Sequence, residues 1–131
     1  FYPQILKKAD PSKLYIYFNE MLQISSKIGK KFAITETGWS SSGLNGSEES
    51  QADFIKKLFR VYANYKDDVE FLGLFVLYDF PESLNRSLAQ SYGLSKFKEY
   101  LKFQGSLGFA YNNGTPKKSW FVLLEKLKKF K

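Results

Sequence analysis

Two short apolar stretches, separated by patterns typical of helices, constrain the fold of this 131-residue chain most strongly. One runs from Lys31 to Thr35 and the other from Phe71 to Tyr78, and such short, apolar and β-branched or aromatic runs predict strands. The second is almost continuously apolar, which is typical of a strand covered on both faces. Because strands and helices alternate, we expect right-handed crossovers and a parallel sheet.

Local start and stop signals delimit the helices between these strands. Asp10 before Pro11 is typical of a helix N-terminus, and Gly29 of a helix end. Ser47, followed by two glutamates, indicates the start of a second helix. These patterns predict helices over 11–29, from Ser47 onward and over 118–130. Residues 82–105 interrupt the alternation of strands and helices as an excursion, in which one short helix is expected over 94–101. The chain is therefore interpreted as a single partial α/β domain, 1–131, whose two clear strands leave open sheet edges.

The residue types that the chain lacks exclude several kinds of chemistry. It contains no histidine and no cysteine, which excludes imidazole acid–base catalysis, Ser-His triads, thiol nucleophiles, disulfides and the usual zinc sites. Carboxylates are then the leading candidates for catalysis, and we predict no metal and no cofactor. No apolar run reaches the ~18 residues that a membrane-spanning helix needs, so no membrane partner is expected.

Residues 32–40 read Phe-Ala-Ile-Thr-Glu-Thr-Gly-Trp-Ser and carry the main functional signal. A short apolar strand here ends on the carboxylate of Glu36, with an aromatic ring, Trp39, just beyond it. In barrel enzymes the C-terminal ends of the strands carry the catalytic groups, and a carboxylate there can attack a sugar. The alternative is that Glu36 is a solvated carboxylate at a strand end.

This stretch closely resembles the seventh-strand signature of clan A glycoside hydrolases, a (β/α)8 family that includes endo-glucanases, endo-galactanases and mannanases. Residues 105–111 and 113–120 resemble the family's closing segment into the eighth helix. The resemblance implies the C-terminal three-eighths of a TIM barrel with parallel strands, from the end of strand six to helix eight. The remaining strands would come from upstream sequence or from another chain, and the open edges allow self-association. An extracellular or secreted location follows from the resemblance alone.

The resemblance also implies roles for individual residues. Glu36 would be the nucleophile of a retaining glycoside hydrolase that acts on a β-linked poly- or oligosaccharide. Tyr2, at the end of strand six, would donate a hydrogen bond to Glu36, or else be only a terminal aromatic residue. Trp39 would stack on a sugar or belong to the core, and Asp79 would hold a substrate hydroxyl or cap the following turn. Tyr78 is expected to help bind the substrate.

Two departures from the family pattern bear on this interpretation. The family's strand-eight tryptophan is replaced here by Leu74, Phe75 and Val76, so stacking would move to Tyr78 or Trp39. The family's acid/base glutamate follows an asparagine at the end of strand four. The pair Asn19-Glu20 matches that dipeptide, but it lies close before Glu36 within a helical pattern, so we interpret it as coincidence. The acid/base would then lie upstream, and this chain alone is expected to be inactive.

Two other kinds of function compete with the enzyme. The chain could be a carbohydrate-binding pseudoenzyme or a non-catalytic fragment that keeps the strand-seven end. The net charge of +7 suggests a nucleic-acid-binding module, with lysines at 117, 118, 126, 128, 129 and 131. A solvated outer face of the last helix explains these lysines better, and no nucleic-acid partner is predicted.

Overall fold

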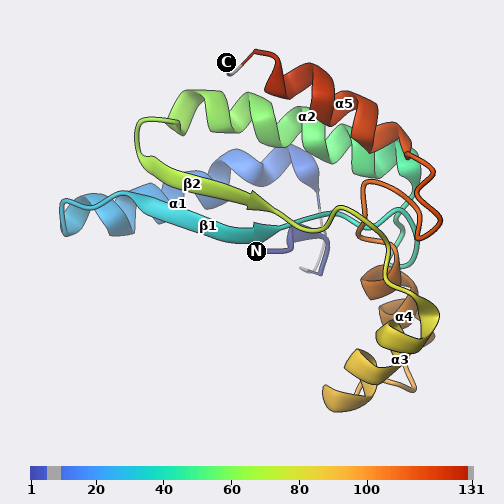
Figure 1. Ribbon diagram of the computed structural model, residues 1–131. Helices are drawn as coiled ribbons and strands as arrows, with labels where there is room; N and C mark the ends of the chain where they lie inside the picture. Colours follow the sequence, from blue (N-terminus) through green and yellow to red (C-terminus); the bar gives the residue numbers. More distant parts are fainter. Residues whose placement is uncertain (6–9, 130–131) are drawn as a thin grey trace.

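The computed structural model describes residues 1–5 and 10–129, and Figure 1 shows their arrangement. Short 3-10 turns at Pro3–Ile5 and Pro11–Lys13 precede the first helix. The helices and strands that follow are α1 (Leu14–Lys27), β1 (Phe32–Thr37), α2 (Glu48–Tyr65), β2 (Val69–Leu74), α3 (Glu82–Ser91), α4 (Lys98–Gly105) and α5 (Lys118–Leu127). Among the described residues no helix has the length and apolar character needed to cross a membrane.

The sheet of the described residues consists of β1 and β2, which run parallel as predicted. Phe32 pairs with Val69 and Thr37 pairs with Leu74, with irregular register between them. Beyond β2 the backbone N–H of Phe75 donates to the carbonyl of Thr37 at 2.8 Å, which extends the pairing to the strand ends. The fold is thus a mixed α/β structure with a partial parallel sheet, while its place in a complete barrel stays a prediction.

One face of the sheet is covered by helices and the other is open. The core shared by the sheet with α1, α2 and α5 includes Leu14, Phe18, Ile34, Phe54, Ile55, Leu58, Val69 and Leu123. On the opposite face Ala33 and Thr35 are exposed, and Phe71 is 50% exposed. The expectation that the second strand is covered on both faces is therefore wrong for the described residues, because their helices pack on one side of it.

The predicted helix starts are confirmed by their capping contacts. The side chain of Asp10 accepts a hydrogen bond from the backbone N–H of Ser12 at 2.8 Å, although the first turn is 3-10 and α1 begins at Leu14. Ser47 caps α2, where its hydroxyl accepts from the N–H of Ser50 at 3.1 Å and the Ser50 hydroxyl accepts from the N–H of Ser47 at 2.8 Å. Such caps satisfy backbone donors that have no partner inside the helix.

The excursion contains two helices, α3 and α4, where the sequence predicted one over 94–101. The sequence of α3 is mostly polar, and its apolar residues Leu84, Leu88 and Ala89 lie within two turns, so its apolar stripe is too short to predict a helix from the sequence. Asn85 joins the two helices, since its side-chain amide donates to the carbonyl of Leu101 at 2.8 Å. The α3–α4 hairpin, residues 82–105, extends beyond the C-terminal ends of β1 and β2 and away from α1, α2 and α5 (Figure 1).

The remaining boundaries differ modestly from the predicted ones. The second strand spans Val69–Leu74 instead of 71–78, and Tyr78 forms only an isolated bridge to Ala110. The last helix ends at Leu127, while its predicted end, Phe130, lies outside the described residues. The tight turn at 112–116 forms as predicted, with the N–H of Tyr111 donating to the carbonyl of Thr115 at 2.9 Å.

Candidate active site at the C-terminal end of the sheet

Glu36 is the second-to-last residue of β1 and its side chain is exposed. It therefore lies at the C-terminal end of the parallel pair, the end at which α/β enzymes carry their reactive groups. The N-terminal segment runs beside this end of the strand, because the backbone nitrogen of Phe1 donates to the Glu36 carbonyl at 2.6 Å. This contact brings Tyr2 next to Glu36.

Tyr2 contacts the carboxylate directly, with its hydroxyl donating a hydrogen bond to Oε1 of Glu36. Its ring packs edge-on against Phe75 and Phe103, with centroid separations of 6.4 Å and 5.9 Å. Partial burial, followed by the bond to Glu36, raises the pKa of Tyr2 well above its ordinary value. The phenol therefore stays protonated and remains a hydrogen-bond donor to the side chain of Glu36.

Gly38, directly after β1, is needed for the close approach of the two strand ends. A Cβ atom at this position would lie 2.5 Å from the carbonyl oxygen of Phe75 and 3.4 Å from the Tyr2 ring. Any larger residue would push apart the backbone that follows β1 and the backbone that follows β2. The Gly in the sequence signature thus has a packing reason in this structure, independent of any resemblance.

Trp39 belongs to the core. It is 6% exposed, its ring stacks on Phe54 with a centroid separation of 5.4 Å, and its indole N–H donates to the Ser50 hydroxyl at 3.2 Å. Both its ring and its polar atom are thus engaged within the protein. Of the two roles that the sequence leaves open for Trp39, stacking on a sugar or belonging to the core, the structure supports the core role. Its ring offers no open face for a sugar.

Asp79 forms a buried ion pair instead of capping the turn that follows it. Its Oδ1 lies 2.6 Å from Nζ of Lys117 and accepts from the N–H of Gly108 at 2.9 Å. The side chain of Lys117 is fully buried, which corrects the prediction that all the lysines near the last helix form a solvated face. Burial, the largest influence, raises the pKa of Asp79 and lowers that of Lys117, while the pair itself opposes both shifts.

The side chain of Tyr78 is 49% exposed. It lines a shallow hollow of about 560 Å³ with Phe80, Asn112 and neighbouring residues of the chain. Neither Glu36 nor Tyr2 lines that hollow. Of the predicted site residues, the structure therefore brings Tyr2 and Glu36 into contact, and it places Trp39, Tyr78 and Asp79 in other surroundings.

The dipeptide Asn19-Glu20 lies in the middle of α1 and not at a strand end. The Asn19 side chain accepts a hydrogen bond from the hydroxyl of Tyr65, at the C-terminal end of α2. In α/β barrels that end of a helix faces the side opposite the catalytic one. This placement agrees with the interpretation of Asn19-Glu20 as a chance match.

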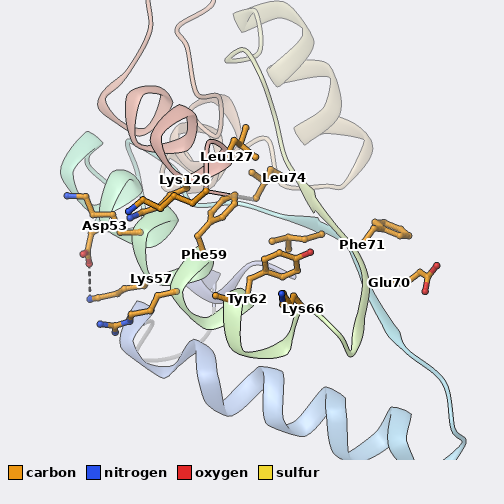
Figure 2. A pocket seen from close by; sticks show the side chains of 15 residues that line it. Asp53, Lys57, Phe59, Tyr62, Lys66, Glu70, Phe71, Leu74, Lys126 and Leu127 are labelled. Carbon is orange, nitrogen blue, oxygen red and sulfur yellow. Dashed lines mark ion pairs between the residues drawn. The ribbon is translucent and has the colours of Figure 1, made fainter. Parts of the chain in front are cut away.

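Another hollow of the described residues lies between α2, β2 and α5 and has a volume of about 1340 Å³ (Figure 2). Its basic lining residues are Lys56, Lys57, Arg60, Lys66, Lys126 and Lys129. Figure 2 shows Lys126 and Leu127 on one side, with Glu70 and Phe71 of β2 on the other. Glu36 and Tyr2 do not line it, so this basic groove is separate from the candidate site.

Two buried polar residues that support the site were missed from the sequence. Gln51, which is 1% exposed, donates through Nε2 to the carbonyl of Trp39 at 2.8 Å and to that of Gly108 at 3.1 Å. Gln4 accepts through Oε1 from the N–H of Ser40 at 2.7 Å. Both glutamines hold the loop after Glu36, and no local pattern separates them from ordinary surface glutamines.

Comparison with known proteins supports the fold and no more. No known family model matches the sequence, and no curated protein matches it either. Among solved structures, the chain is similar to a β-glucuronidase from Faecalibacterium prausnitzii, with a TM-score of 0.67 and 15% sequence identity. The match covers 98% of this chain and 21% of that protein, so the chain spans about a fifth of its length. We conclude that the chain shares the α/β fold of the part of that β-glucuronidase with which it aligns.

Proposed function

We propose that the chain is part of a retaining glycoside hydrolase and that Glu36 is its nucleophile. The observation that carries the proposal is the position of Glu36: an exposed carboxylate at the C-terminal end of a parallel strand, in contact with a phenol that stays protonated. The likeness to a β-glucuronidase adds fold-level support, since an enzyme of that name cleaves glycosides. The expected substrate is a β-linked poly- or oligosaccharide.

The proposed chemistry proceeds in two displacements. A carboxylate oxygen of Glu36 attacks the anomeric carbon, and the bond from that carbon to the leaving oxygen breaks. The leaving oxygen takes a proton from a second carboxylic acid. Water then attacks the same carbon, gives up its proton to that second carboxylate, and releases Glu36. Throughout, the hydroxyl of Tyr2 donates to Glu36 and keeps its reactive oxygen oriented.

The second carboxyl group must lie ~5 Å from the nucleophile for retention. In this chain the sequence around Glu20 resembles that of the family's acid/base residue, but Glu20 lies on α1 and not at a strand end. We therefore propose that the acid/base belongs to the remaining barrel strands. The outer edge of β2 beside the basic groove is one place where additional strands could pair, since a sheet edge carries unpaired backbone groups.

Covalent labelling tests the assignment of Glu36. The protein that contains the complete barrel is incubated with activated 2-deoxy-2-fluoro β-glycosides of several sugars, and the modified peptide is identified by mass spectrometry. We expect a label on Glu36 and none after Glu36→Gln. The matched control is Glu70→Gln, which changes an exposed carboxylate on the other strand and should still be labelled at Glu36.

Turnover provides the second readout. Glu36→Gln should lower kcat by about 10⁴-fold or more, as loss of a nucleophile does, while the thermal melting temperature changes little because the side chain is exposed. Wild-type-like turnover in this variant would refute the proposal. Carbohydrate binding without turnover or labelling in the unaltered protein would instead identify a pseudoenzyme.

A further inference from the structure

The α3–α4 hairpin is joined to the candidate site through aromatic rings. Phe103 of α4 packs against Tyr2 with a centroid separation of 5.9 Å, and Tyr100, one turn earlier, lies 6.3 Å from Phe103. Tyr2 in turn bonds to Glu36. A continuous series of contacts therefore runs from the carboxylate through Tyr2 and Phe103 to Tyr100.

The tyrosines along this series of contacts also influence one another's pKa values. Burial and the bond to Glu36 are the main causes of the raised pKa of Tyr2, and the neighbouring Tyr100 adds to them. Burial raises the pKa of Tyr100, and Tyr92 adds to that shift. Electrostatic influence of this kind requires proximity. Tyr92 and Tyr100 thus lie near each other on the α3–α4 hairpin, and the ring contacts of Phe103 with Tyr100 and Tyr2 connect them to Glu36. Tyr92 and Tyr100 are called the tyrosine row below.

Along the hairpin, the aromatic side chains become more exposed with distance from Glu36. Phe103 is 4% exposed, Tyr100 is half-buried, and Tyr92 at the end of α3 is 63% exposed. Phe97, at the start of α4, is 60% exposed. Exposed aromatic side chains gathered on one element mark a binding surface. Phenols combine a flat apolar face with a hydroxyl, which suits a pyranose ring with its apolar face and polar rim.

The hairpin is held firmly against the loop that follows Glu36. The N–H of Leu44 donates to the Glu99 carboxylate at 3.2 Å, and the hydroxyl of Ser106 donates to the carbonyl of Ser42 at 3.0 Å. Gly43 has a φ of +70°, and a Cβ there would lie 2.6 Å from the carbonyl oxygen of Glu99. These contacts hold α4, and Tyr100 with it, in one position relative to the loop after Glu36, as a preformed subsite requires.

We propose that the tyrosine row, Tyr92 and Tyr100 on the α3–α4 hairpin, forms a distal binding subsite for a carbohydrate chain of several residues. This inference rests on the proposed function and makes it more specific: the substrate is an extended saccharide that passes Glu36 and continues along the hairpin. Figure 1 shows that the hairpin projects beyond the strand ends, where such a chain would lie. A short glycoside would occupy only the Glu36 end.

Binding measurements on the Glu36→Gln protein test the subsite without turnover. The probes are the disaccharides to hexasaccharides of cellulose, β-1,3-glucan, β-1,4-galactan and β-1,4-mannan, measured by titration calorimetry. We expect Kd for one series to fall with each added sugar, and Tyr92→Ala with Tyr100→Ala to raise the hexasaccharide Kd by about tenfold or more, as the loss of aromatic contacts predicts. Tyr15→Ala, which removes an exposed tyrosine from α1, should leave that Kd unchanged.

The outcomes separate this inference from the function on which it rests. If affinity does not grow with chain length in any series, or the paired substitution leaves the hexasaccharide Kd unchanged, the distal subsite is refuted even where Glu36 is labelled. If Glu36 is not labelled but the tyrosine substitutions still weaken hexasaccharide binding, the subsite stands and the catalytic proposal falls. The single variant Tyr92→Ala, at an exposed position, decides the matter if the paired variant does not fold.

Discussion

The amino group of Lys117 lies 2.6 Å from Oδ1 of Asp79, in a position where the lysine side chain is fully buried. It also donates to the hydroxyl of Ser41 at 2.8 Å and contacts the carbonyl of Ser106 at 3.3 Å. Lys117 thus ties together the loop after β1, the segment after β2 and the start of α5. Removing one partner of such a buried ion pair is strongly destabilising, because it leaves an unpaired charge in the interior.

Removing the carboxylate should therefore destabilise the fold strongly. We expect Asp79→Asn to lower the free energy of unfolding by about 3–5 kcal/mol, as measured by chemical denaturation, because it leaves the ammonium buried without its counter-ion. The control is the exposed pair between Lys118 and Glu49, where Glu49→Gln should have little effect. Equal stability of Asp79→Asn and wild type would show that the pair does not hold these segments together.

Loss of the phenol should affect turnover more than folding. Tyr2→Phe keeps the ring against Phe75 and Phe103 but removes the hydrogen bond to Glu36. In the complete barrel that we propose, we expect kcat to fall about 10- to 100-fold, the value of a hydrogen bond to a charged group. Because the pKa of Tyr2 is raised, its ionisation should not limit activity up to the ordinary tyrosine pKa. Unchanged kcat would exclude a positioning role for Tyr2.

The buried glutamine of α2 should be essential for stability. Gln51→Leu leaves the carbonyls of Trp39 and Gly108 without the donor that now lies 2.8 Å and 3.1 Å away. Because buried polar groups without partners are costly, we expect the free energy of unfolding to fall by about 2–4 kcal/mol. Gln23→Leu at an exposed position on α1 is the matched control. A similar small change in both variants would contradict the prediction.

Glu48 should make stability depend on acid pH. It accepts hydrogen bonds from the hydroxyl of Tyr111 and from the N–H of Lys118, at 2.9 Å for the latter, and these bonds lower its pKa below the ordinary 4.5, with the bond from Tyr111 contributing most. A lowered pKa in the folded state means that the stabilisation is complete above pH 4.5 and is lost as pH falls through the folded-state value.

Melting temperatures across the acid range check this sign. Wild type should lose stability relative to Glu48→Gln as pH falls below the ordinary value of 4.5, and the two should differ most near neutral pH. The difference should be at most about 1 kcal/mol, because Glu48 is near the surface and its interactions are screened by solvent. A constant difference at every pH would show that ionised Glu48 is not the source of the stabilisation.

Local patterns in the sequence were enough to predict several features. Asp10 and Ser47 were identified as helix caps because a cap acts on backbone groups only two or three residues away. The first apolar run predicted a strand with Glu36 near its end, and the structure places Glu36 in β1. The parallel arrangement followed from the alternation of strands and helices. Each inference depended on neighbours in the chain or on the order of elements.

The features that the sequence did not decide all depend on contacts between distant segments. Trp39 is in the core because Phe54 and Ser50 of α2 engage it, and Lys117 is buried because Asp79, 38 residues earlier, supplies its counter-charge. The helix α3 has only a short apolar stripe, formed by Leu84, Leu88 and Ala89, and is held by Asn85 against α4. Periodicity and capping report only the local chain, whereas the burial of a charge or an indole is set by which segments the fold brings together. The sequence therefore determined where the carboxylate stands along the chain, and the tertiary structure decided which side chains surround it.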